Sequence, residues 1–158
     1  MKPVLYLDVD GVLWNIVEGE PDRAARKPTW AGPANGLENF LEYAFETFEV
    51  RWCTTWAMSG TMRPEDMENL YGHTDVPVET WAKVQPSYGW REYKSENVDW
   101  EEHDAGRPFA WVEDELCTFE HETLRKHGFQ DSYYYTDVFE DADALVKTLA
   151  KLKERFGK

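Results

Sequence analysis

Two carboxylates follow a short apolar run near the start of the chain. Asp8 and Asp10 stand two residues apart at the end of the apolar segment 4–9, and Gly11 comes next. Two like charges about 4 Å apart repel by about 1 kcal/mol in bulk water, and by about 4 kcal/mol at an effective dielectric constant near 20. A divalent cation or a raised pKa is expected to compensate such a pair. An oxygen-only site suits Mg²⁺ better than Zn²⁺, and the glycine permits a positive φ or a close backbone approach.

The same motif fits other kinds of site less well. A calcium-binding helix-loop-helix loop that starts at Asp8 requires Gly at its sixth position and Glu at its twelfth, where this chain has Leu13 and Gly19. The Asp-x-Asp motif of glycosyltransferases usually lies deep in a larger nucleotide-sugar domain, whereas this one begins at residue 8 of 158. A solvated acidic turn is the alternative if the motif acts alone.

Two later apolar segments also end in polar side chains. Thr54 and Thr55 end the segment 50–53 with hydroxyl and amide groups that can hold phosphate oxygens, although a threonine here is also a common helix cap. Glu113 and Asp114 follow Phe109-Ala110-Trp111-Val112, and such an acidic pair is also common at the start of a helix. The joint occurrence of these patterns favours one shared site.

Alternating strands and helices are expected to position these groups. Apolar runs predict strands, at 4–9, 50–53, 109–112 and 132–136. Helical spacing and end signals predict helices, at 37–48, from Pro64 to Gly72, at 118–127 and at 145–156. This order implies βα units and a mostly parallel sheet that is covered on both faces. Functional groups gather at the carboxyl ends of the strands in such sheets.

Two parts of the chain give weaker signals. Residues 73–107 show no strong period, and a minor strand at 76–78 is the only element expected there. The last helix is expected to have an acidic first turn containing Glu140, Asp141 and Asp143, as the helix dipole favours.

Composition limits the classes of protein. A length of 158 residues predicts one domain. The formal charge of −14 is the wrong sign for a protein that coats nucleic acid by neutralising phosphates. Cys53 and Cys117 have no Cys-x-x-Cys spacing, so neither a disulfide framework nor a zinc site is expected. The sequence shows no secretion signal or membrane span, so we expect a cytoplasmic protein with reduced thiols and no membrane partner.

Taken together, the motifs resemble those of the haloacid dehalogenase-like (HAD) phosphohydrolase superfamily. The resemblance rests on the segments 7–13, 52–56 and 107–115 together with a lysine, and it spans nearly the whole chain. It implies a single α/β domain over 1–158, a HAD-type Rossmann-like three-layer sandwich with a mostly parallel central sheet. The cap would be small or absent, and residues 15–36 would be the candidate cap insert.

The resemblance implies the hydrolysis of a phosphomonoester through an aspartyl phosphate. Asp8 would be the nucleophile, and Asp10 would be the general acid and then the general base. Dehalogenases of the superfamily lack the second Asp, so phosphoryl chemistry is favoured here. Thr54 would bind the phosphoryl group, with Thr55 as its alternative and Gly11 also in the substrate-binding set.

A magnesium ion is the cofactor that the resemblance implies. Its ligands would be Asp8, the backbone carbonyl of Asp10, and Asp114. Glu113 would ligate the ion directly or act through water, at a position where the superfamily more commonly has Asp.

The site also needs positive charge beyond one metal ion, because four carboxylates would face a phosphate dianion. Lys94 is the lysine that we expect to supply it, with Lys83 as the second candidate. Arg23, Arg26 and Lys27 form a basic cluster in the insert. This cluster would either hold an anionic substrate, with Arg26 as the candidate contact, or form a solvated loop.

Three functions remain open from the sequence. The first is a phosphatase for a small phosphorylated metabolite or nucleotide. The second is a nucleic-acid end (3′-) phosphatase, which a small cap would permit, although the acidic charge disfavours a polyanionic substrate. The third is a HAD-fold module that binds a ligand or partner without turnover.

Several aromatic and histidine residues lie outside these motifs. Trp14 and Trp56 flank the expected site, and we expect them to pack in the core or rim, with stacking on a base or sugar as the alternative. The histidines show no metal-ligand spacing, so surface or capping roles are expected for His73, His103, His121 and His127.

Overall fold

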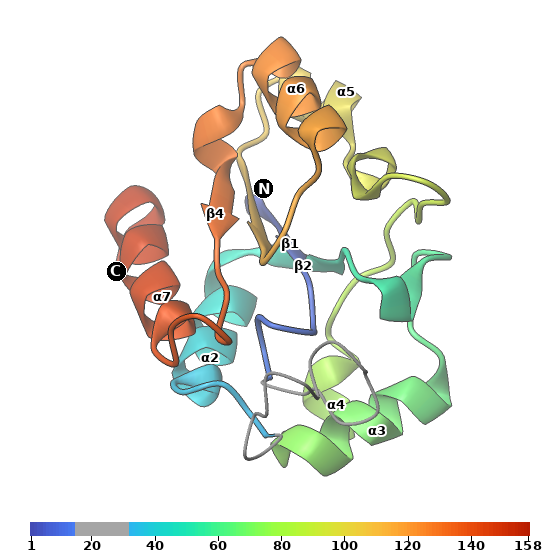
Figure 1. The fold of residues 1–158 in the computed structure, drawn as a ribbon, viewed down its shortest axis with the longest axis vertical. Coiled ribbons are helices and arrows are strands. Elements are labelled where there is room, and N and C mark those ends of the chain that lie inside the picture. The colour runs from blue at the N-terminus through green and yellow to red at the C-terminus, as the bar shows by residue number, and fades with distance from the viewer. Residues whose placement is uncertain (15–31) are drawn as a thin grey trace.

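A parallel four-stranded sheet forms the centre of the computed structural model, which describes residues 1–14 and 32–158 (Figure 1). The strands are β1 (Val4–Leu7), β2 (Glu49–Trp52), β3 (Phe109–Glu113) and β4 (Tyr133–Tyr135). Their order is β2-β1-β3-β4, and every neighbouring pair is parallel. The predicted α/β class and parallel sheet are therefore confirmed.

The strand register aligns the carboxyl ends of the three longer strands. Leu7 at the end of β1 is level with Trp52 in β2 and with Val112 in β3. The residues that follow Leu7 and Trp52 therefore leave the sheet at the same edge as Glu113. This alignment brings the three sequence motifs to one place.

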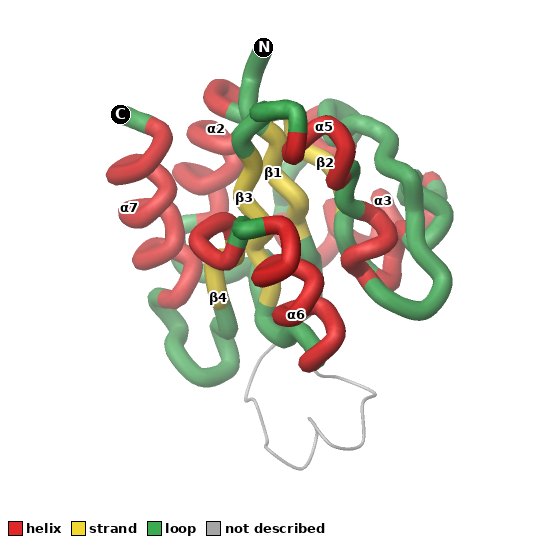
Figure 2. The backbone as a smooth tube through the Cα atoms, turned by 90° about the horizontal axis from the view of Figure 1, so that it is seen from above, coloured by secondary structure: helices red, strands yellow, loops and turns green. Residues whose placement is uncertain are grey.

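Helices cover both faces of the sheet (Figure 2). One face packs against α2 (Leu37–Thr47) and α7 (Ala144–Phe156), and the other packs against α5 (Trp100–Asp104) and α6 (Thr118–His127). The remaining helices are α3 (Pro64–Thr74) and α4 (Val78–Trp81), with the short 3₁₀ segments η1 (Thr55–Ala57), η2 (Lys94–Asn97) and η3 (Gln130–Ser132). Within the described ranges, no helix has both the length and the apolar character needed to cross a membrane.

The alternation of side chains along β1 builds two cores. Leu5 and Leu7 belong to the larger core, which α2 and α7 share. Val4 and Tyr6 point to the smaller core on the side of α6, which contributes Leu124. Every residue of β1 is fully buried, as an apolar strand covered on both faces requires.

Three details of the predicted elements were wrong. The helix that starts at Pro64 continues through Gly72 to Thr74, and Asp75 ends it with φ 59°. Residues 76–78 form no strand, because Pro77 precedes the short helix α4 and this segment lies outside the sheet. The last helix begins at Ala144, so its first turn contains no acidic residue.

The acidic residues before α7 instead form a turn. The side chain of Asp141 accepts a hydrogen bond of 2.9 Å from the backbone N–H of Asp143, which holds the chain in a turn just before the helix. Asp143 occupies the N-cap position. The acidic charges therefore precede the helix instead of lying within its first turn.

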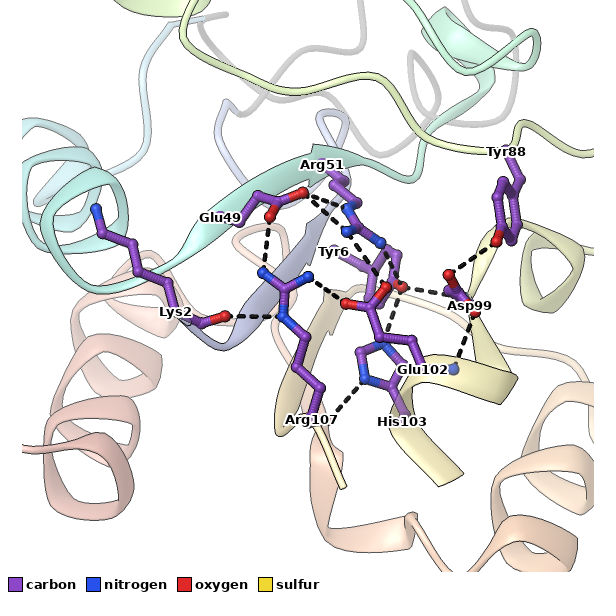
Figure 3. A network of polar contacts seen from close by, with 9 residues as sticks. All are labelled: Lys2, Tyr6, Glu49, Arg51, Tyr88, Asp99, Glu102, His103 and Arg107. Atoms are coloured by element: carbon purple, nitrogen blue, oxygen red, sulfur yellow. Dashed lines mark hydrogen bonds and ion pairs between the residues drawn. The ribbon is translucent and has the colours of Figure 1, made fainter. Parts of the chain in front are cut away.

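A polar network joins the amino ends of β2 and β3 to α5 (Figure 3). Arg107 pairs with Glu49 at 2.7 Å and also with Glu102 of α5. Arg51 pairs with the same two carboxylates, at 2.8 and 3.5 Å. This network ties α5 to the sheet at the edge opposite the aligned carboxyl ends.

His103 occupies the buried centre of this network, so the predicted surface or capping role is wrong for it. Its side chain is 2% exposed, since α5 presses it against Tyr6 of β1 and Phe109 of β3. Nε2 lies 2.9 Å from the Tyr6 hydroxyl, and Nδ1 lies 2.7 Å from the carbonyl oxygen of Arg107. Nδ1–H must donate to that carbonyl, and Nε2 then accepts from Tyr6, so the ring is neutral.

Two other histidines lie as expected. His121 is exposed at the surface, and His127 at the end of α6 lies 3.0 Å from Asp104. The side chain of His73 lies outside the described part of the structure.

Replacing His103 with Gln is expected to flatten the pH dependence of stability. Burial lowers the pKa of His103 below its ordinary value. Its contribution to stability is therefore complete above the unfolded pKa of about 6.5, and is lost as the pH falls from there toward the folded pKa. The wild-type free energy of unfolding is expected to fall with a slope of up to about 1.4 kcal/mol per pH unit from this group.

Urea unfolding between pH 7.5 and 5 measures this effect. The exposed control His121→Gln is expected to keep the wild-type slope, whereas His103→Gln is expected to be less stable at pH 7.5 and less sensitive to acid. Equal slopes in wild type and His103→Gln would show that His103 is not the titrating group.

Candidate active site

Three carboxylates converge at the aligned carboxyl ends of β1 and β3. Asp8 follows β1, Glu113 ends β3, and Asp114 comes next. One carboxylate oxygen from each of the three lies within 4.8 Å of the others. Asp8 is 4% exposed and Glu113 is fully buried. The chain thus concentrates negative charge where water cannot fully screen it.

A cavity of about 460 Å³ adjoins these carboxylates. Its described lining residues come from several strand ends and loops: Asp8, Asp10, Thr55, Trp90, Glu92, Tyr93, Lys94, Glu113, Asp114, Glu115, Cys117 and Glu120. Six of the residues predicted from the motifs are therefore brought together: Asp8, Asp10, Thr55, Lys94, Glu113 and Asp114.

Lys94 of η2 lies between two of the carboxylates. Its Nζ is 2.7 Å from Oε2 of Glu113 and 3.4 Å from Oδ2 of Asp8. Burial alone would lower the pKa of Lys94, but the charges of Asp8 and Glu113 outweigh it and raise that pKa above its ordinary value. Lys94 is therefore a cation here. Lys83, the second candidate, is exposed, and its Nζ lies 5.7 Å from the ring centre of Phe45, in a different part of the molecule.

The acidic cluster has the composition of a divalent cation site. Burial raises the pKa of Glu113 well above its ordinary value, and the charge of Asp8 adds to this. Burial likewise raises the pKa of Asp114. Three ionised carboxylates and one Lys94 ammonium would leave two negative charges, which one divalent cation would balance. Buried carboxylate oxygens are the hard ligands that Mg²⁺ takes, so the residues present fit this ion.

Gly11 lets the chain pass close to Asp114. It has φ +76°, and a Cβ placed on it would lie 2.5 Å from Oδ2 of Asp114. Its carbonyl accepts a hydrogen bond of 2.8 Å from the backbone N–H of Val138, which fixes the loop. Gly11 does not line the cavity among the described residues, so the structure gives it a role in seating Asp114.

Replacing Gly11 with Ala is expected to destabilise the protein and displace Asp114. The left-handed conformation alone costs about 1–2 kcal/mol for a residue with a Cβ, and the contact with the carboxylate adds to this. Gly72→Ala is the matched control, because Gly72 is exposed in α3 and its Cβ would meet nothing within 4 Å. That control is expected to gain about 0.5–1 kcal/mol. Urea unfolding measures both changes, and equal stability of the two variants would contradict the role assigned to Gly11.

Two tryptophans orient the carboxylate of Asp10. Nε1 of Trp14 donates to Oδ1 at 2.8 Å, and Nε1 of Trp56 donates to Oδ2 at 3.3 Å. The two rings pack edge to face with their centres 4.8 Å apart. Trp14 is fully buried, so its ring packs in the core and does not stack on a substrate. The sequence placed both rings near the site but gave no sign that they donate to Asp10.

The two threonines after β2 occupy different positions. Thr54 is 1% exposed, and its Oγ1 accepts a 3.3 Å hydrogen bond from the backbone N–H of Trp56. It therefore caps η1 and is absent from the described lining of the cavity. Thr55 is exposed and lines the cavity. Of the two predicted phosphate-binding residues, Thr55 is the one in reach of the cavity.

Sequence reasoning missed most of the outer cavity wall. Trp90, Glu92 and Tyr93 belong to the segment without a clear period, and Glu115 and Cys117 follow the acidic motif. The basic cluster containing Arg26, and the insert from 15 to 31, lie outside the described residues.

Comparisons of the chain with protein-family models, curated proteins and solved structures found no match.

Proposed function

We propose that this protein is a magnesium-dependent phosphomonoester hydrolase of HAD type that works through an aspartyl phosphate on Asp8. The observation that carries the proposal is the position of Lys94, whose ammonium lies between Asp8 and Glu113 at the common carboxyl end of the strands. A carboxylate beside a fixed cation and an acidic cluster is suited to attack a phosphorus centre that the same cations hold.

The side chains can account for both halves of the reaction. An oxygen of the Asp8 carboxylate attacks phosphorus, the ester P–O bond breaks, and protonated Asp10 gives its proton to the leaving alcohol oxygen. Asp10 then takes a proton from water, whose oxygen attacks phosphorus. The P–O bond to Asp8 breaks, and inorganic phosphate leaves. The indole N–H groups of Trp14 and Trp56 hold Asp10 in one orientation through both steps.

Positive charge would come from Lys94 and from a bound metal ion. Asp8, Glu113 and Asp114 would hold Mg²⁺, with the Asp10 carbonyl as the ligand that the HAD resemblance adds. The ion would supply charge for the phosphoryl oxygens. Thr55 replaces Thr54 as the residue proposed to donate a hydroxyl hydrogen bond to the phosphoryl group, because it lines the cavity.

A panel of phosphoesters with Mg²⁺ or with EDTA tests this function. Phosphate release from p-nitrophenyl phosphate and from small phosphoesters is expected with Mg²⁺ and is expected to stop with EDTA. The panel includes a mononucleotide and a 3′-phosphorylated oligonucleotide, and faster release from the oligonucleotide would favour the end-phosphatase alternative. Absence of magnesium-dependent release from every ester would favour a module that binds without turnover.

Magnesium is also expected to stabilise the fold without any substrate. An ion that binds only the folded state adds about 2.7 kcal/mol at 100 times its dissociation constant. Asp114→Asn is expected to remove most of the resulting rise in melting temperature. The exposed control Glu122→Gln is expected to keep it, because Glu122 lies on α6 outside the cavity. Equal magnesium-dependent shifts in both variants would place the ion elsewhere.

A further inference from the structure

The acidic cavity wall carries a second inference, which rests on the proposed function. We infer that the substrate is the phosphomonoester of a positively charged alcohol, one that bears an amine or a quaternary ammonium group. The phosphoryl group would lie at Asp8 and Lys94, and the cationic group would contact the outer wall of the same cavity.

The outer wall adds negative charge and no further cation. Glu92, Glu115 and Glu120 line the cavity in addition to the four carboxylates at its base, and Lys94 is the one Lys or Arg in its described lining. Lys94 already pairs with Asp8 and Glu113. Among the described lining residues, no other cation remains to hold a second anionic group of a substrate. Bisphosphates and nucleoside diphosphates are therefore poor candidates.

The three outer carboxylates differ in their availability. Glu120 is buried, and its two oxygens accept backbone hydrogen bonds from Ser95 at 2.9 Å and from Cys117 at 3.3 Å. It therefore contributes charge but is held in place by the chain. Glu92 and Glu115 are exposed and line the cavity. These two are the carboxylates that a cationic group can reach.

Aromatic rings line the same wall. Trp90 and Tyr93 both border the cavity. Tyr93 stacks on Phe119 with ring centres 4.2 Å apart and planes at 27°, so its position is fixed by packing. Aromatic faces attract ammonium groups, and this attraction grows where water is excluded. Rings beside carboxylates provide both parts of a site for an organic cation.

The grooves on either side of the cavity do not change this charge balance. The groove beyond Asp114 and Glu115 has a volume of about 630 Å³, and no Lys or Arg is among its described lining residues. The groove beyond Thr55 contains Arg63, but its guanidinium pairs with Asp66 at 3.0 Å and with Glu65 at 3.7 Å. The described surface around the cavity therefore favours a cationic group.

Two esters of equal shape test the inference. Choline phosphate carries a quaternary ammonium, and 3,3-dimethylbutyl phosphate has a carbon in place of that nitrogen. The measured quantity is the ratio of their kcat/KM values. In the double variant Glu92→Gln with Glu115→Gln this ratio is expected to fall about tenfold relative to wild type. Comparing the ratio between proteins cancels the difference in leaving-group chemistry between the two esters.

A matched control removes the same number of charges elsewhere. Glu122 and Glu154 are exposed on α6 and α7, and neither lines the cavity. The double variant Glu122→Gln with Glu154→Gln is expected to keep the wild-type ratio. Added salt is expected to lower the wild-type ratio, because it screens exposed charges.

The outcomes separate this inference from the proposed function. If both esters release phosphate with Mg²⁺ and the ratio is the same in wild type and in Glu92→Gln with Glu115→Gln, the inference is overturned and the phosphatase stands. If no ester is hydrolysed, the proposed function fails, and calorimetry with the same two esters then tests recognition alone. Equal affinity for both esters would overturn the inference there too.

Discussion

Asp8→Asn is expected to abolish phosphate release and to leave the fold unchanged. The amide has nearly the shape of the carboxylate but is not a competent nucleophile, so no aspartyl phosphate can form. Loss of a covalent nucleophile lowers kcat by about 10⁴-fold or more. Asp8 is buried at the end of a central strand, so a substitution of equal size is needed to keep the packing.

Purified wild type and Asp8→Asn compared with Mg²⁺ and p-nitrophenyl phosphate measure this loss. The control Asp131→Asn makes the same chemical change at an exposed position and is expected to keep wild-type activity. Circular dichroism of each protein shows whether the fold is retained. Wild-type turnover by a folded Asp8→Asn variant would refute the nucleophile assignment.

Lys94→Met is expected to lower both activity and stability. The methionine keeps an unbranched apolar side chain but removes the ammonium that lies 2.7 Å from Glu113. Removing one partner of a buried ion pair typically costs about 3–5 kcal/mol, because the remaining charge has no partner. Phosphate release is expected to fall at least about 10²-fold, since a cation aimed at the reacting group is lost.

Two further variants separate charge from packing. Lys83→Met makes the same change in an exposed lysine away from the cavity and is expected to alter neither property. The double variant Lys94→Met with Glu113→Gln removes both members of the pair, so it is expected to recover part of the stability but none of the activity. Urea unfolding in EDTA and phosphate release with Mg²⁺ measure the two effects. A stable and active Lys94→Met variant would contradict this account of the site.

Elements with a clear period were predictable from the sequence. Helix α6 runs from Thr118 to His127 and ends at Gly128, as its end signals indicate. Each predicted main strand is present, because apolar runs covered on both faces identify themselves. The segment 73–107 could not be read, since it forms short helices and loops whose conformation depends on contacts with the sheet. α5 is an example, because its place depends on His103 and Tyr6 meeting across 97 residues.

The site divides along the same line. The motifs identified Asp8, Glu113 and Asp114, because residues at aligned strand ends must be neighbours. The choice of Thr54 over Thr55 needed the local path of η1, which turns the first hydroxyl inward. The indole donors to Asp10 depend on side-chain orientation, which no spacing rule describes. Sequence patterns thus located the edge of the sheet but not the full set of side chains around it.

The strand order also constrains how this chain can acquire its structure during synthesis. β1 is made first, yet Val4 is paired with Glu49 and with Phe109, which lie 45 and 105 residues later. Pairings this distant in sequence slow folding, because a long loop must close before any contact rewards it. A ribosome-bound chain therefore carries the apolar segment of β1 unpaired on one edge until β3 has emerged. The strand that ends in Asp8 is thus the segment of the nascent chain most in need of protection from aggregation.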